Sequence, residues 1–153
     1  MGVLDKLINR CKKDICVIRK IKQEEISLIA ENYENIMKEQ FEKVGEEPIT
    51  KDKYEKILKN NFRDSSMFVL EENGIKAFIW FIKEGDEIYL EEVFSIEKNK
   101  GYGSRLMNFL IDYAKKKKIK RINVDVHLKN KEALHFFKSL GFTERTIELS
   151  LDI

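Results

Sequence analysis

The chain has 153 residues, which suits one domain and is too short for two full-sized ones. Hydrophobic residues make up 42% of it, and 29 basic residues nearly balance 27 acidic ones, so a disordered chain and a broadly basic surface are both excluded. The longest apolar run, residues 77–82, is far shorter than the roughly 20 residues that cross a bilayer. We therefore expect a globular protein without nucleic-acid or membrane partners.

Two cysteines, Cys11 and Cys16, stand five residues apart with no second cluster, a spacing that fits neither a zinc site nor a disulfide framework. The first residues lack the apolar core of a signal peptide, and Lys6 occupies the position where a myristoylation motif has Ser or Thr. These observations predict a cytoplasmic protein with reduced cysteines and no metal.

The first third of the chain is predicted to form a helix, a strand and two further helices. Apolar spacing indicates a short amphipathic helix in residues 1–13, and a β-branched run at residues 15–18 indicates a strand. A helical stripe follows over residues 22–41. After a polar stretch, Thr50 is a suitable N-cap for a helix that reaches Phe62.

The middle of the chain predicts a three-stranded meander. The Asn73-Gly74 pair is a strong hairpin signal, because both residues tolerate positive φ, and a second turn is expected at Gly85-Asp86. The three strands are residues 67–70, 77–82 and 88–94.

Beyond the meander the apolar period changes to that of a helix, which begins after the turn at residues 101–104. A strand at residues 122–126, a helix from Asn130 to Gly141 and a last strand over residues 143–153 complete the chain. The predicted order is β α α β β β α β α β, in a single mixed α/β domain over residues 1–153 with a helical extension at 1–13.

The turn before the second-half helix is the main chemical signal. Gly101 and Gly103 leave backbone amides uncovered by a Cβ atom, and the helix behind them adds unpaired N–H groups and a positive dipole end. This arrangement suits a diphosphate, although a turn that only connects strand to helix would have the same glycines. A dinucleotide fingerprint needs a glycine where Leu106 stands, and the Walker pattern is absent.

Two motifs together resemble the signatures of the GNAT superfamily of acyl-CoA N-acyltransferases, and the likeness extends over about residues 15–150. The first motif is Lys98-x-x-Gly101-x-Gly103, and the second is Asn130-x-x-Ala133-x-x-Phe136-Phe137-x-x-x-Gly141-Phe142.

The resemblance implies a sheet in which the strands at residues 87–95 and 121–127 splay apart and admit the pantetheine arm of acetyl-CoA. Backbone amides from Gly101 to Arg105 would then hold the diphosphate, and strand backbone near Val93 would pair with the pantetheine. The residues expected at the acetyl-CoA site are Val93, Phe94, Ser95, Lys98, Lys100, Gly101, Tyr102, Gly103, Ser104, Arg105, Asn130 and Phe137.

The sequence departs from the family pattern at two positions. Lys98 replaces the usual Arg or Gln, which keeps a cation but loses the planar fork. Phe137 replaces a tyrosine whose phenol can protonate the departing thiolate, so the usual general acid is missing.

A proton acceptor is required, because a free alkylamine is mostly protonated at neutral pH and only the neutral amine attacks a thioester. Glu91 and Glu92 lie in an apolar strand, where successive side chains face opposite sides, so at least one should point toward the cleft or the helix-covered layer. Burial would raise its pKa toward the range of a general base. Alternatively both lie on an exposed rim, and Glu87 is the third candidate.

Two functions fit these features: an acetyl-CoA-dependent N-acetyltransferase, or a non-catalytic acyl-CoA-binding or regulatory module of the same fold. The acceptor would be a small-molecule or protein amine, and the protein a monomer or homodimer. The lysines at 115–118 suit a helix C-terminus better than a nucleic-acid site. We interpret His127 and His135 as surface or edge residues. Tyr33, Phe41 and Tyr54 either pack in the core or help to line an acceptor pocket.

Overall fold

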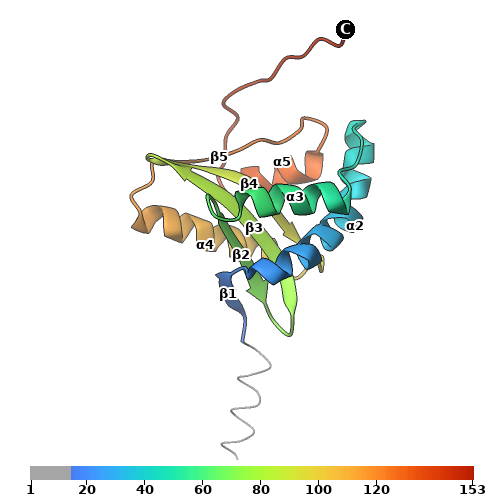
Figure 1. The fold of residues 1–153 in the computed structure, drawn as a ribbon. Helices are drawn as coiled ribbons and strands as arrows, with labels where there is room; N and C mark the ends of the chain where they lie inside the picture. The colour runs from blue at the N-terminus through green and yellow to red at the C-terminus, as the bar shows by residue number, and fades with distance from the viewer. Residues whose placement is uncertain (1–14) are drawn as a thin grey trace, which may run out of the picture.

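The computed structural model describes residues 15–153 (Figure 1), so the helix predicted at residues 1–13 lies outside the described residues. The elements are β1 (Val17–Lys20), the 3-10 turn η1 (Gln23–Glu25), α2 (Ile26–Val44), α3 (Lys51–Asn61), β2 (Ser66–Glu71), β3 (Ile75–Glu84), β4 (Glu87–Ser95), α4 (Tyr102–Lys116), β5 (Arg121–Val124) and α5 (Lys131–Ser139). The mixed α/β fold class is therefore confirmed.

The five strands form one sheet in the order β1-β2-β3-β4-β5. The first four strands pair antiparallel, whereas β5 pairs parallel with β4 after the crossover through α4. Asn73 and Gly74 have positive φ in the predicted turn between β2 and β3, and Gly85 does the same between β3 and β4.

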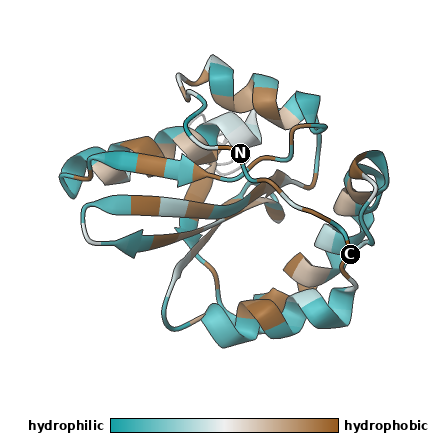
Figure 2. Cartoon of the chain, turned by 90° about the horizontal axis from the view of Figure 1, so that it is seen from above, coloured by the Kyte–Doolittle hydropathy of each residue, from teal (hydrophilic) through white to brown (hydrophobic). Residues whose placement is uncertain are grey.

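Helices cover both faces of the sheet (Figure 2), and strand alternation supplies a core to each face. On β3, Phe78 and Trp80 pack into the cluster that includes the buried residues of α2 and α3. Ile79 and Phe81 point to the other face and pack with the buried residues of α4. The same strand therefore anchors both layers, which holds β4 beside it in a fixed position.

Local capping sets the boundaries of α2 and α3. The Thr50 side chain accepts a hydrogen bond from the Lys53 amide and so begins α3 as expected. Helix α2 continues three residues beyond the predicted end at Phe41 and stops at Gly45, whose left-handed φ of 76° ends the helix.

One predicted strand is wrong. Residues 143–153 form no strand and run away from the body of the molecule (Figure 1), and β5 is also shorter than predicted. The alternating pattern of residues 143–153 favours a strand. A strand also needs a neighbouring backbone to pair with, and in the described chain this segment pairs with none. The observed order therefore lacks the final β of the prediction.

Among residues 15–153, no helix combines the length and apolar composition that a membrane crossing requires.

Candidate active site

Strands β4 and β5 pair at one end and separate at the other. Their pairing runs from Glu87 and Arg121 to Leu90 and Val124 and then ends. At the same point β4 carries a bulge, since Leu90 and Glu92 face neighbouring residues of β3 and Glu91 between them is extra. A bulge bends its strand and increases the local twist. The splayed strands expected from the family resemblance are present, and the backbone edge of β4 beyond the bulge is free on the β5 side.

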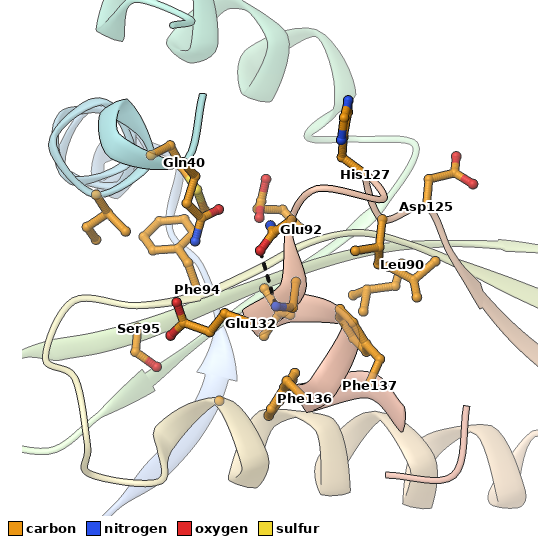
Figure 3. A pocket seen from close by; sticks show the side chains of 18 of the residues that line it. Gln40, Leu90, Glu92, Phe94, Ser95, Asp125, His127, Glu132, Phe136 and Phe137 are labelled. Atoms are coloured by element: carbon orange, nitrogen blue, oxygen red, sulfur yellow. Dashed lines mark hydrogen bonds between the residues drawn. The ribbon is translucent and has the colours of Figure 1, made fainter. Parts of the chain in front are cut away.

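A cavity of about 400 Å³ opens between the separated strands (Figure 3). Its walls are the second half of β4, the chain from Val124 to His127, one side of α2, and the beginnings of α4 and α5. Residues from the predicted site that line it are Glu91, Glu92, Val93, Phe94, Ser95, Lys98, Gly103, Asn130 and Phe137. Most of the predicted site is thus brought to one place.

The glycine turn meets this cavity at Gly103, whereas Gly101, Tyr102 and Ser104 lie outside its lining. Gly101 precedes α4 in the left-handed region, with φ 73°, and its carbonyl accepts the first helical hydrogen bond from the Arg105 amide at 3.1 Å. No side chain caps the helix, and in residues 15–153 the amides of Tyr102, Gly103 and Ser104 donate to no protein group. These amides sit at the positive end of a 15-residue helix, so the turn is suited to an anion.

Cations surround the turn unevenly. Lys98 lines the cavity, whereas Lys100 is exposed outside its lining. Arg105 is exposed on the first turn of α4 and lies 3.9 Å from Glu72. Lys98 is therefore the one of these three cations that lines the cavity. Within the described residues, no three His, Cys, Asp or Glu side chains are grouped in a way that could hold a metal ion.

The start of α5 forms the opposite wall. The Asn130 side chain caps this helix by accepting a hydrogen bond from the Ala133 amide at 3.2 Å. This bond uses its oxygen and leaves the amide NH₂ available to a ligand. Phe137 is buried and packs edge-on against Phe136 and Phe142. No tyrosine lines the cavity in the described part of the chain, so the cavity wall offers no phenol in place of the one missing at Phe137.

Among the carboxyl groups that line the cavity in the described residues, Glu92 alone is partly buried (Figure 3). Burial raises the pKa of Glu92 to about 8. The hydrogen bond from the Val93 amide acts in the opposite direction and lowers the pKa, whereas the charge of Glu91 raises it further. Glu91, the extra residue of the bulge, also lines the cavity but is largely exposed. Partial desolvation of its carboxyl group and then the charge of Asp125 raise its pKa.

Glu87 lies elsewhere. It stands at the paired end of β4, outside the cavity lining, where its carboxylate accepts a hydrogen bond from Arg121 Nη1 at 2.8 Å. Tyr89 Oη donates to it at 3.4 Å. A carboxylate held by an arginine in this way is a structural ion pair, so the structure separates Glu87 from the other two candidate bases.

Sequence reasoning gave several cavity residues no functional role. His127 was read as a surface residue, yet it lines the cavity, and its Nδ1 accepts a hydrogen bond from the Lys129 amide at 3.1 Å. Its place just beyond a strand that was expected to splay is the signal that could have identified it. Asp125, Gln40 and Glu132 also line the cavity, and Gln40 comes from α2, far away in sequence.

The aromatic residues considered for the acceptor side are part of the core. Tyr33 and Tyr54 stack with ring centroids 3.6 Å apart and are buried, and neither lines the cavity. Phe41 packs partly buried against the same cluster. All three residues therefore pack in the core. Burial and then the charge of Glu92 raise the pKa of both tyrosines, so their phenols lie near this carboxyl.

Comparisons with known proteins agree with this geometry. The family model described as the Acetyltransferase (GNAT) family matches residues 30–142. An uncharacterised N-acetyltransferase of Methanocaldococcus jannaschii is 35% identical over 66 residues, which are 43% of this chain and 28% of that protein. This chain therefore matches less than a third of the curated relative's length.

Solved structures share the fold at low identity. A possible acetyltransferase from Clostridium difficile 630 is 19% identical with a TM-score of 0.76, covering 92% of this chain and 98% of that one. The PaiA N-acetyltransferase from Thermoplasma acidophilum, solved with coenzyme A, is 17% identical with a TM-score of 0.73, covering 88% and 93%. With the family model matching well over half of its residues, the chain belongs to the GNAT family of acetyltransferases.

Proposed function

We propose that this protein transfers an acetyl group from acetyl-CoA to a primary amine, with Glu92 as the general base. The observation that carries the proposal is the juxtaposition of a half-buried carboxyl group that lines the cavity and a set of unpartnered helix N-terminal amides that reaches the cavity at Gly103. The acceptor is a small-molecule or protein amine.

The free amides from Tyr102 to Ser104 would bind the diphosphate of the donor, with Lys98 adding a cation. From there the open edge of β4 leads along Val93 and Ser95, whose backbone groups are oriented to pair with an extended amide chain. Asn130 contributes its free NH₂ group from the other wall. A pantetheine arm laid along this edge would bring its thioester toward the bulge.

Glu92 stands beside that position, and no cation among residues 15–153 contributes to its pKa. Its carboxylate would take the proton that the attacking amine must lose, directly or through a water molecule. The amine nitrogen bonds to the thioester carbon, the carbon–sulfur bond breaks, and the electron pair leaves with the sulfur. A carboxyl with a pKa of about 8 is partly ionised at physiological pH and is a much stronger base than an exposed glutamate.

The thiolate leaves without a protein acid in this proposal. Phe137 offers no proton and no tyrosine lines the cavity within residues 15–153. A thiolate is stable enough near neutral pH to depart before it is protonated by solvent. Glu91 is exposed at the cavity mouth and we assign it an acceptor-facing position rather than the role of base.

The proposal is tested by a thermal shift with acetyl-CoA and by thiol release across a panel of amines. Acetyl-CoA at about 100 times its dissociation constant should stabilise the fold by about 2.7 kcal/mol, and at least one amine should release CoA thiol. Stabilisation without release from any amine would favour the binding-module alternative. Absence of a shift at millimolar acetyl-CoA would reject both functions.

A further inference from the structure

One polar atom in the core lacks a partner. Tyr54, on α3, is 3% exposed, and its Oη is the one buried side-chain polar atom in residues 15–153 that makes no hydrogen bond. Burying a hydroxyl without a hydrogen bond destabilises a fold, so an unpartnered one calls for an explanation. Phenylalanine would fill the same space without this cost. Packing alone therefore does not account for a tyrosine at this position.

Glu92 faces the same layer of the molecule. It pairs with Trp80 of β3 in the register of the sheet and stands two residues before Phe94 on β4, so all three side chains share one face. Trp80 and Phe94 belong to the core cluster that includes the buried residues of α2 and α3. The indole N–H of Trp80 donates to Ser65 Oγ at 2.8 Å and is thus not available to Glu92.

Two phenols are the remaining polar side chains among the buried residues of that cluster. Tyr33, on α2, packs edge-on against Phe94 with ring centroids 6.0 Å apart and stacks on Tyr54 at 3.6 Å, so the stack lies beside the strand position of Glu92. After burial, the charge of Glu92 is the largest cause that raises the pKa of each phenol. Both phenols therefore stay protonated near neutral pH, and Tyr54 is the one whose Oη is buried without a partner.

We propose that Tyr54 is a positioning residue for Glu92. Its phenol donates a hydrogen bond, directly or through a water molecule, to the Glu92 carboxylate when this group is ionised. The proton stays on the phenol, and the bond holds the carboxylate beside the position of the thioester. The inference rests on the proposed role of Glu92 as the base, and it gives the buried hydroxyl a partner in the state that catalysis uses.

Other titratable groups also face Glu92. Glu91 is its neighbour on β4, Tyr33 comes from α2, and the titratable residues that line the cavity from the remaining elements are Lys98, Asp125, His127 and Glu132. All of these groups are present both in the wild type and in a Tyr54 variant. A comparison of the two proteins therefore isolates the effect of the Tyr54 hydroxyl.

The test is a site-resolved carbon NMR titration of Glu92 in Tyr54→Phe, which removes one oxygen and keeps the ring stack. Loss of a donor disfavours the ionised carboxylate, so the Glu92 midpoint should rise by about one pH unit above the wild-type midpoint. The acidic limb of kcat/KM for acetyl transfer should move upward by the same amount. The matched control Tyr113→Phe removes a hydroxyl on the opposite face of the sheet, beside Phe81, and should change neither quantity.

An unchanged Glu92 midpoint in Tyr54→Phe would overturn the proposal, and higher stability of that variant would then identify the hydroxyl as merely unpartnered. A second measurement uses the wild-type protein, in which the Cζ resonance of Tyr54 should titrate with the Glu92 midpoint and lose this step in Glu92→Gln. A Tyr54 resonance that does not respond to Glu92 would also overturn the proposal. Failure of the proposed function gives a different result, because Glu92→Gln would then keep its activity while a shifted midpoint in Tyr54→Phe still supported the hydrogen bond.

Discussion

The two ends of β4 place glutamates in opposite settings. At the paired end, Glu87 accepts a hydrogen bond from Arg121 on the adjacent strand and lies outside the lining of the cavity. At the open end, beyond the bulge, Glu92 has no such partner, and burial raises its pKa to about 8. The same residue type on one strand is therefore an ion-pair member where β5 is beside it, and where β5 has separated it is the carboxyl that we propose as the base.

The largest expected effect comes from neutralising Glu92 and Glu87 in separate variants. Glu92→Gln should lower kcat/KM for acetyl transfer by about 100- to 1,000-fold, because a positioned general base contributes rates of that order. Glu87→Gln is the matched control on the same strand and should leave the rate within about twofold. Dissociation constants for acetyl-CoA, measured by calorimetry, should be similar in both variants.

The reverse result would be decisive against the assignment. If Glu87→Gln lost the activity and Glu92→Gln kept it, the paired end of β4 would be the reactive one.

A second prediction contrasts two glycine turns that flank the same strand. Gly101 and Gly85 both have positive φ, with open space where a Cβ would lie, so alanine at either position carries similar backbone strain of about 1–2 kcal/mol. Only Gly101 shapes the free amides of α4. Gly101→Ala should therefore weaken acetyl-CoA binding by about tenfold, whereas Gly85→Ala should not.

Both variants should lose similar free energy of unfolding in urea titrations. Equal acetyl-CoA affinities in the two variants would mean that the turn before α4 does not hold the diphosphate.

A third, smaller effect concerns Glu25, whose environment is the opposite of that of Glu92. The hydrogen bond from the Arg19 guanidinium lowers the pKa of Glu25 to about 2. A lowered folded-state pKa adds stability above the unfolded value near 4.5, and this stability is lost as pH falls toward 2. Glu25→Gln should lower the free energy of unfolding by about 1–2 kcal/mol at pH 7 and by much less near pH 2.

The exposed pair Lys43 and Glu39 provides the control for that prediction. Glu39→Gln should change the free energy of unfolding by less than about 0.5 kcal/mol at either pH. A pH-independent loss in Glu25→Gln would show that the ion pair with Arg19 does not stabilise the fold.

Local signals in the sequence predicted most of the fold. The turns at Asn73-Gly74 and Gly85, the Thr50 cap and the change of period after β4 depend on nearby residues, and the structure has all of them. The strand expected at residues 143–153 failed because alternation describes a face to be buried and does not specify which backbone it pairs with.

The part of the site that consists of residues close together in sequence was predictable. The residues from Glu91 to Gly103 lie close together in sequence, and most of them meet at the cavity. The bulge that ends the β4–β5 pairing depends on register with β3, so sequence alone could not rank Glu92 above Glu87. Gln40 reaches the cavity only through the packing of α2, for which a single sequence carries no signal.

The most direct measurement is a site-resolved titration of the Glu92 carboxyl by carbon NMR in the free protein, assigned with Glu92→Gln. This measurement needs no amine acceptor and is not affected by titration of the substrate. The expected midpoint lies near pH 8, so that the base form increases as pH rises through that value. A midpoint near 4.5, the ordinary value of an exposed glutamate, would contradict the account.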